Sequence, residues 1–164
     1  MPWYPQAIVF VVAALVLALR MVRPLRAWAL TTDIRSLIAF HLIRFVGFYF
    51  LFLYSLGELP YNFAVFGGWG DIAVAVLALV VMFFCVKSRS ALVVWNLLGL
   101  ADIVAVAATA ARDEMAVPGS MHLLDRFPLI LLPTCIVPLI LVTHLLMLVR
   151  AARYRSWMGV APVD

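Results

Sequence analysis

The chain has 164 residues, of which 67% are hydrophobic and 12% are charged, and its mean hydropathy is +1.13. This composition leaves too little polar surface to cover a water-soluble globule of that length. The formal net charge is +4 at pH 7, but the basic residues are spread over three short segments instead of one face. The composition therefore excludes a soluble domain, argues against a nucleic-acid partner and predicts an all-α integral membrane protein in a lipid bilayer.

Five apolar stretches follow one another along the chain, separated by short polar breaks. Each is close to the ~20 residues that a helix needs to cross a hydrocarbon core of ~30 Å. The predicted transmembrane helices cover residues 6–22, 36–57, 70–86, 91–111 and 127–149. Because the breaks are short, consecutive helices should be antiparallel, and residues 1–164 should form a single membrane domain.

The basic residues predict the orientation of these spans. Nine of the twelve Lys and Arg residues flank the first connection, lie in the third or follow the last span: Arg20, Arg23, Arg26, Arg35, Lys87, Arg89, Arg150, Arg153 and Arg155. Basic residues are enriched on the cytoplasmic side of membrane proteins. We therefore expect an N-terminus outside and a C-terminus in the cytoplasm of a bacterial inner membrane protein.

The first span differs from the other four because it has no polar residue between Ile8 and Leu19. We expect this helix to face lipid and spans two to five to form a bundle with a polar centre. The basic residues come after the first span and none precedes it, which is unlike a cleaved signal peptide, so it should persist. The chain has no CxxC, HExxH, GxSxG or Gly-rich phosphate loop, and an enzyme is not indicated.

Arg44 lies inside the second span, too deep for its side chain to reach water easily. An antiparallel fourth span would bring Asp102 to a similar depth, so we predict an Arg44–Asp102 ion pair. Such a pair could be static and fix the register of the two helices, or it could act as a gate or a substrate clamp. Asn96 is about 120° around the helix from Asp102 and should face another neighbour, through a hydrogen bond between helices.

Asp71 follows Gly67–Gly70 and is expected to cap the third span at its outer end, where the amides of the first turn are unpaired. The alternative is an acid at the mouth of a path, acting together with Glu58. In the fifth span, Pro138 removes the amide partner of the Thr134 carbonyl. That carbonyl could face a water or an ion, or the Thr134 side chain could repair a simple kink.

His41, Asn96 and His144 should share one layer on the cytoplasmic side, because each lies at a similar distance from that end of its span. Two histidines on different helices at one depth could be the axial ligands of a haem b. They could also be structural or relay protons.

Together these residues form a polar ladder across the bilayer: Glu58 and Asp71 outside, Arg44, Asp102 and Thr134 in the middle, and His41, Asn96 and His144 inside. A ladder at all depths favours proton- or ion-coupled transport of a small solute. Two other hypotheses stay open. One is a bis-histidine haem b protein that transfers electrons. The other is an accessory subunit of a larger membrane complex, and a monomer or a homo-oligomer would count against it.

Several segments of the chain resemble a family of small uncharacterised bacterial inner-membrane proteins. The matching segments are His41 to Leu53, Leu59-Pro60 with Phe63-Ala64, Gly68 to Asp71, Trp95 to Asp102, Leu132 to Thr134, and Val137-Pro138 to His144-Leu145-Leu146. The resemblance covers about residues 40–149, without the first span. It implies a helical membrane fold and a bacterial origin, and it carries no established activity.

Overall fold

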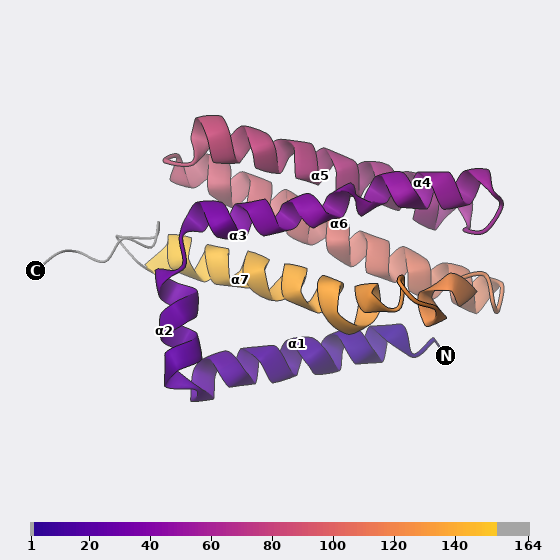
Figure 1. Cartoon of the computed structure of the whole chain (residues 1–164), viewed down its shortest axis with the longest axis horizontal. Helices are drawn as coiled ribbons and strands as arrows, with labels where there is room; N and C mark the ends of the chain where they lie inside the picture. Colours follow the sequence, from indigo (N-terminus) through magenta and orange to yellow (C-terminus); the bar gives the residue numbers. More distant parts are fainter. Residues whose placement is uncertain (1, 154–164) are drawn as a thin grey trace, which may run out of the picture.

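The computed structural model describes residues 2–153, which are almost entirely helical and contain no β-strand. Five of its helices are long and apolar enough to cross a membrane: Tyr4–Met21, Ile34–Ser55, Asn62–Cys85, Arg89–Ala116 and Leu132–Ala152. They lie side by side with short connections, so neighbours along the chain are antiparallel (Figure 1). The predicted helical class and the five helices capable of spanning a membrane are confirmed.

Three of the five helices are composite. The first helix is α1 (Tyr4–Met21) and the fourth is α6 (Arg89–Ala116), both regular. The second joins α3 (Ile34–Phe40), the 3₁₀ segment η1 (His41–Val46) and α4 (Gly47–Ser55). The third joins the π segment η2 (Asn62–Gly67), α5 (Gly68–Val80) and the π segment η3 (Val81–Cys85). The fifth joins the π segment η5 (Leu132–Ile136) to α7 (Val137–Arg153).

Three predicted boundaries are wrong, and one of them is the end of the fourth helix, which continues to Ala116 instead of residue 111. The third helix begins at Asn62 instead of residue 70, because the glycines at 67–70 continue the helix with ordinary negative φ. The fifth begins at Leu132 instead of residue 127, after a short 3₁₀ turn η4 (His122–Asp125) and further turns. Pro128 explains why Phe127 is not part of the helix, since the residue before a proline is held away from the helical region.

The helix α2 (Arg23–Thr31) replaces what the sequence predicted as a short connection. It lies across one end of the bundle, nearly perpendicular to the long helices (Figure 1). Pro24 lies in its first turn, where a missing amide hydrogen costs nothing. At its other end, the fully buried Arg150 of α7 donates a hydrogen bond of 2.7 Å to the Thr32 carbonyl. Below, this end of the bundle is the α2 end, and the opposite end is the loop end.

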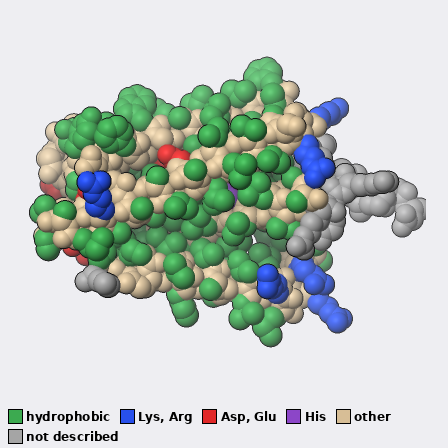
Figure 2. Space-filling model, turned by 180° about the vertical axis from the view of Figure 1, so that it is seen from behind, with side chains coloured by type: hydrophobic (Ala, Val, Ile, Leu, Met, Phe, Trp, Pro, Cys, Tyr) green, Lys and Arg blue, Asp and Glu red, His purple; other side chains and the backbone are tan. Residues whose placement is uncertain are grey.

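The outer surface is largely apolar, as a lipid-facing surface must be (Figure 2). The first helix is the most peripheral, because 6% of its apolar stretch is buried, against 33% or 39% in the other four. Its buried residues are Tyr4 and Ile8, near the loop end. The other four helices therefore make up most of the core, and α1 covers one side of it.

Two glycines set the closest approach of the second and third helices. A Cβ atom on Gly68 would lie 2.9 Å from the carbonyl oxygen of Gly47, and a Cβ on Gly47 would collide with the Gly68 carbonyl. Small residues at such positions let two membrane helices pack backbone to backbone. The contact lies one turn from Arg44 and three residues from Asp71, so it holds these two side chains in register.

We expect Gly47→Ala to destabilise the protein by about 1–3 kcal/mol, since the added methyl group meets backbone that cannot rotate away. Thermal unfolding in mild detergent would measure the loss. Val76→Ala, at an exposed position on α5, is the matched control and should change the stability by less than about 0.5 kcal/mol. Equal melting temperatures for the two variants would contradict the close helix crossing.

Candidate functional site

Arg44 is fully buried in the interior of the bundle. Its guanidinium donates three hydrogen bonds to two other helices. Nε donates to Asp71 Oδ1 at 2.7 Å, Nη1 donates to the Gly99 carbonyl at 2.9 Å, and Nη2 donates to Asp102 Oδ2. The predicted ion pair with Asp102 is therefore present, and Asp71 makes a second one. We call Arg44, Asp71 and Asp102 the charged cluster.

Glycines make room for the charged cluster. Gly70 lies against the Asp102 carboxylate, and a Cβ at that position would collide with it. Gly99 comes one turn before Asp102 on α6 and offers its carbonyl to Arg44. Arginine carries five N–H donors in a rigid plane, so it can bind both carboxylates and this carbonyl at once.

Asp71 does not cap a helix, and this expectation was wrong. The third helix starts at Asn62, so Asp71 lies well inside it, and its side chain is only 4% exposed. Deep in the helix the backbone amides are already paired with preceding carbonyls. The Asp71 carboxylate instead binds Arg44 of the neighbouring helix.

The charged cluster holds one guanidinium and two carboxylates, so its formal charge is −1 when both acids are ionised. Burying an uncompensated charge is costly, because the medium between apolar helices screens and solvates it poorly. A bound proton or another small cation would bring the cluster to neutrality. Asp102 is the more accessible acid, since its side chain is 22% exposed against 4% for Asp71.

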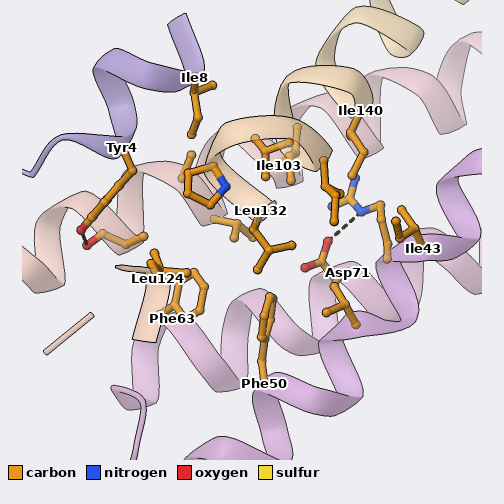
Figure 3. A pocket seen from close by; sticks show the side chains of 18 residues that line it. Tyr4, Ile8, Ile43, Phe50, Phe63, Asp71, Ile103, Leu124, Leu132 and Ile140 are labelled. Carbon is orange, nitrogen blue, oxygen red and sulfur yellow. Dashed lines mark hydrogen bonds and ion pairs between the residues drawn. The ribbon is translucent and has the colours of Figure 1, made fainter. Parts of the chain in front are cut away.

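A cavity of about 50 Å³ adjoins the charged cluster on the side of the loop end. Arg44 and Asp71 form its polar wall, and apolar side chains of the second, third, fourth and fifth helices form most of the rest. Figure 3 shows Asp71 at one end of this space and Tyr4 of α1 at the other, with Phe50 and Phe63 between them. One water needs about 10–15 Å³ on the same measure, so a few waters fit.

A second polar cluster lies on the other side of Arg44, toward the α2 end. His41 and His144 are fully buried, and their ring centres are 4.1 Å apart. His144 Nδ1 is 2.8 Å from Asn96 Oδ1, and His41 Nε2 is 3.1 Å from the Thr143 hydroxyl. Trp95 packs against both rings. The structure therefore brings together the predicted layer of His41, Asn96 and His144. We call the two histidines the imidazole pair.

The imidazole pair does not fit the axial ligation of a haem. Two axial imidazoles lie on opposite faces of the porphyrin, and iron–nitrogen bonds of about 2 Å keep their ring centres roughly 6 Å apart. The observed separation is 4.1 Å, which is direct ring contact. As a separate matter from haem, residues 2–153 hold no group of three His, Cys, Asp or Glu side chains arranged for a metal ion.

Two residues of the predicted polar ladder lie elsewhere. Glu58 is half exposed in the turn after α4, 3.7 Å from His122, so it does not act together with the buried Asp71. The Thr134 hydroxyl donates to the Ile130 carbonyl at 2.6 Å in its own segment. Its side chain is therefore held by the preceding turn instead of lying in the Arg44 layer, and its one hydroxyl hydrogen is used on Ile130, not on the Thr134 carbonyl whose amide partner Pro138 removes.

Sequence reasoning missed several residues that position the site. The aromatic Trp95 and the hydroxyl of Thr143 were not singled out, although each contacts His41. Gly70 and Gly99 could have been found from the sequence, because each lies within one helical turn of an acid in a predicted span. Arg150 was assigned to the basic flank, but it is buried and binds the end of α2.

The described residues form a helical protein with five helices able to cross a membrane and with ionisable groups buried between these helices. The chain belongs to the family described as Domain of unknown function (DUF8737), whose model matches residues 1–152. The match includes the first helix, which the resemblance noted above left out. No curated protein and no solved structure matches the chain.

We expect Arg44→Gln to destabilise the protein by about 3–5 kcal/mol, because it leaves two buried carboxylates without their cation. Unfolding with a denaturing detergent, followed by circular dichroism, would measure this loss.

The combined variant Arg44→Gln, Asp71→Asn, Asp102→Asn removes the charges together and should recover most of the stability. If the single and the combined variants unfold alike, the charges of the cluster do not interact as the geometry indicates.

Proposed function

We propose that this chain conducts protons, or another small cation coupled to a small solute, across a bilayer by way of the charged cluster. The observation that carries the proposal is the pairing of one buried arginine with two carboxylates. Membrane proteins place unbalanced ionisable groups between their helices chiefly where an ion or proton passes. A static ion pair would need one carboxylate, and the second acid gives the cluster a place for one positive charge.

Polar groups or a cavity lie on both sides of the charged cluster along the bundle. The cavity extends from the cluster toward Tyr4 and the loop end. On the other side, the Gly99 carbonyl links Arg44 to the backbone turn on which His144 packs. Polar groups therefore follow one another along the bundle axis from the cavity to the imidazole pair. Such a series is what proton transfer over membrane distances requires.

The distribution of charge supports an orientation with the α2 end in the cytoplasm of a bacterial inner membrane. Most of the basic side chains visible in Figure 2 lie at this end. The described basic residues at this end are Arg20, Arg23, Arg26, Arg35, Lys87, Arg89 and the buried Arg150, with Asp33 as the acid among them. The opposite end carries four acids, Glu58, Asp113, Glu114 and Asp125, and two basic residues, Arg112 and Arg126. This asymmetry follows the positive-inside rule.

Asp102→Asn should abolish proton flux into liposomes while the protein keeps its helical content. Asparagine can still accept a hydrogen bond from Arg44 but cannot ionise at ordinary pH. Flux is measured with a pH-sensitive dye inside the vesicles, driven by a potassium gradient and valinomycin. Glu58→Gln, at an exposed position of the loop end, is the control and should keep the flux of the unaltered protein. Proton flux in Asp102→Asn liposomes equal to that of the unaltered protein would contradict the proposal.

The orientation is tested with single cysteines in a variant that lacks Cys85 and Cys135. Met115→Cys lies at the loop end and Ser90→Cys at the α2 end, both at exposed positions. A membrane-impermeant maleimide added to intact cells should label the first and spare the second until the cells are opened. The reverse pattern would invert the proposed topology.

A further inference from the structure

The helix α2 indicates where the surface of a bilayer would meet this protein. It crosses the α2 end nearly at right angles to the long helices (Figure 1). Its Trp28 side chain is 63% exposed, and Arg23 and Arg26 are exposed as well. Exposed arginine and tryptophan on a helix that runs across the ends of membrane-spanning helices are typical of the interface between water and hydrocarbon. The α2 end is therefore the level at which lipid headgroups would lie.

A hollow of about 520 Å³ opens at this level. It is lined by Arg35, in the first turn of α3, and by residues 83–88, which end η3 and form the turn before α6. The two segments belong to the second and third helices, because α3 packs against η3. We call this space the basic hollow, since Arg35 and Lys87 are its two charged side chains.

The polar groups of the basic hollow are free to bind an anion. None of the ion pairs among residues 2–153 includes Arg35 or Lys87, and Asp33, the acid at this end, does not line the hollow. The Ser88 hydroxyl accepts a hydrogen bond from a backbone amide of α6 at 3.3 Å, so its own hydrogen can be donated to a ligand. Two cations and one hydroxyl donor match the oxygens of a phosphate group.

The apolar wall of the basic hollow favours a lipid as the source of that phosphate. Phe83 and Phe84 line the hollow and are 65% and 83% exposed. They lie in η3, at the end of a helix able to cross a membrane, next to the turn that carries Lys87. A soluble phosphate compound would leave both rings uncovered, whereas acyl chains would pack against them. Basic pockets between membrane helices are known to bind anionic headgroups.

We propose that the basic hollow binds an anionic phospholipid. Arg35 and Lys87 bind the phosphate of its headgroup, and the Ser88 hydroxyl donates a hydrogen bond to it. The acyl chains lie against Phe83 and Phe84. The lipid thereby joins the ends of the second and third helices. None of these residues belongs to the charged cluster, so the inference does not rest on the proposed function.

Lipid binding is measured by native mass spectrometry of the full chain in mild detergent. Dioleoyl phosphatidylglycerol is the anionic lipid and dioleoyl phosphatidylcholine the zwitterionic one, and the unaltered protein should bind the first more tightly. Arg35→Gln and Lys87→Gln should each weaken the binding of phosphatidylglycerol about five-fold, and the double variant about 25-fold. These factors correspond to about 1 kcal/mol for each basic residue near an anionic lipid.

The matched control is the double variant Arg23→Gln, Arg26→Gln, which removes the same charge from α2, outside the basic hollow. It should keep most of the affinity for phosphatidylglycerol. Without added lipid, both double variants should melt at the temperature of the unaltered protein, because all four side chains are exposed. Equal losses of affinity in the two double variants would show attraction by net charge alone and would overturn the proposal. Equal affinities of the unaltered protein for the two lipids would overturn it as well.

A last comparison separates a lipid from a soluble phosphate compound. Phe84→Ala should weaken the binding of phosphatidylglycerol, because it removes part of the wall for the acyl chains. The probe sn-glycerol 3-phosphate carries a phosphate without acyl chains, and at equal concentration it should not displace the lipid. Displacement by this probe, or an unchanged affinity in Phe84→Ala, would overturn the proposal in favour of a soluble ligand.

Discussion

The packing of three helices in this molecule depends on one buried guanidinium, which needs hydrogen-bond acceptors. Arg44 is fully buried between helices, so its N–H groups must find partners on other helices. They find them on α5 and α6, and the glycines at 70 and 99 bring the backbone and the Asp102 carboxylate within reach. The contacts among the second, third and fourth helices thus meet at one side chain. Breaking such a cluster leaves a charge that the interior cannot compensate.

Much of the fold was predictable from the sequence, because hydrophobic length is a direct physical requirement of the bilayer. The same requirement explains the failures. Gly67–Gly70 was taken as a break, but glycine is common within membrane helices, where no water competes for the backbone hydrogen bonds. The helix α2 was taken as a loop because it is short and carries arginine and proline. Its helical form depends on packing and on Arg150, which a local pattern does not contain.

The site was predictable to the extent that depth alone determines contacts. Antiparallel spans place Arg44 opposite Asp102, and equal distances from one end place His41 beside His144. Direction around each helix was harder to predict. Asp71 was assigned to a helix end, and its place opposite Arg44 depends on where the third helix begins. Thr134 has the right depth, but its hydroxyl is held by the preceding turn of its own segment.

The backbone contact between Gly47 and Gly68 also has a mechanical consequence. Two helices that touch through main-chain atoms cannot slide or rotate past each other without collision, so α4 and α5 behave as one stiff unit. Arg44 and Asp71 both belong to the helices of this unit, whereas Asp102 belongs to α6 and His144 to α7. Any rocking of the second and third helices against α6 and α7 would therefore stretch the Arg44–Asp102 contact and leave the Arg44–Asp71 contact intact. Arg44 is thereby fixed to the second and third helices. Its ion pair with Asp102 is the contact that would have to break for α6 to move away from them.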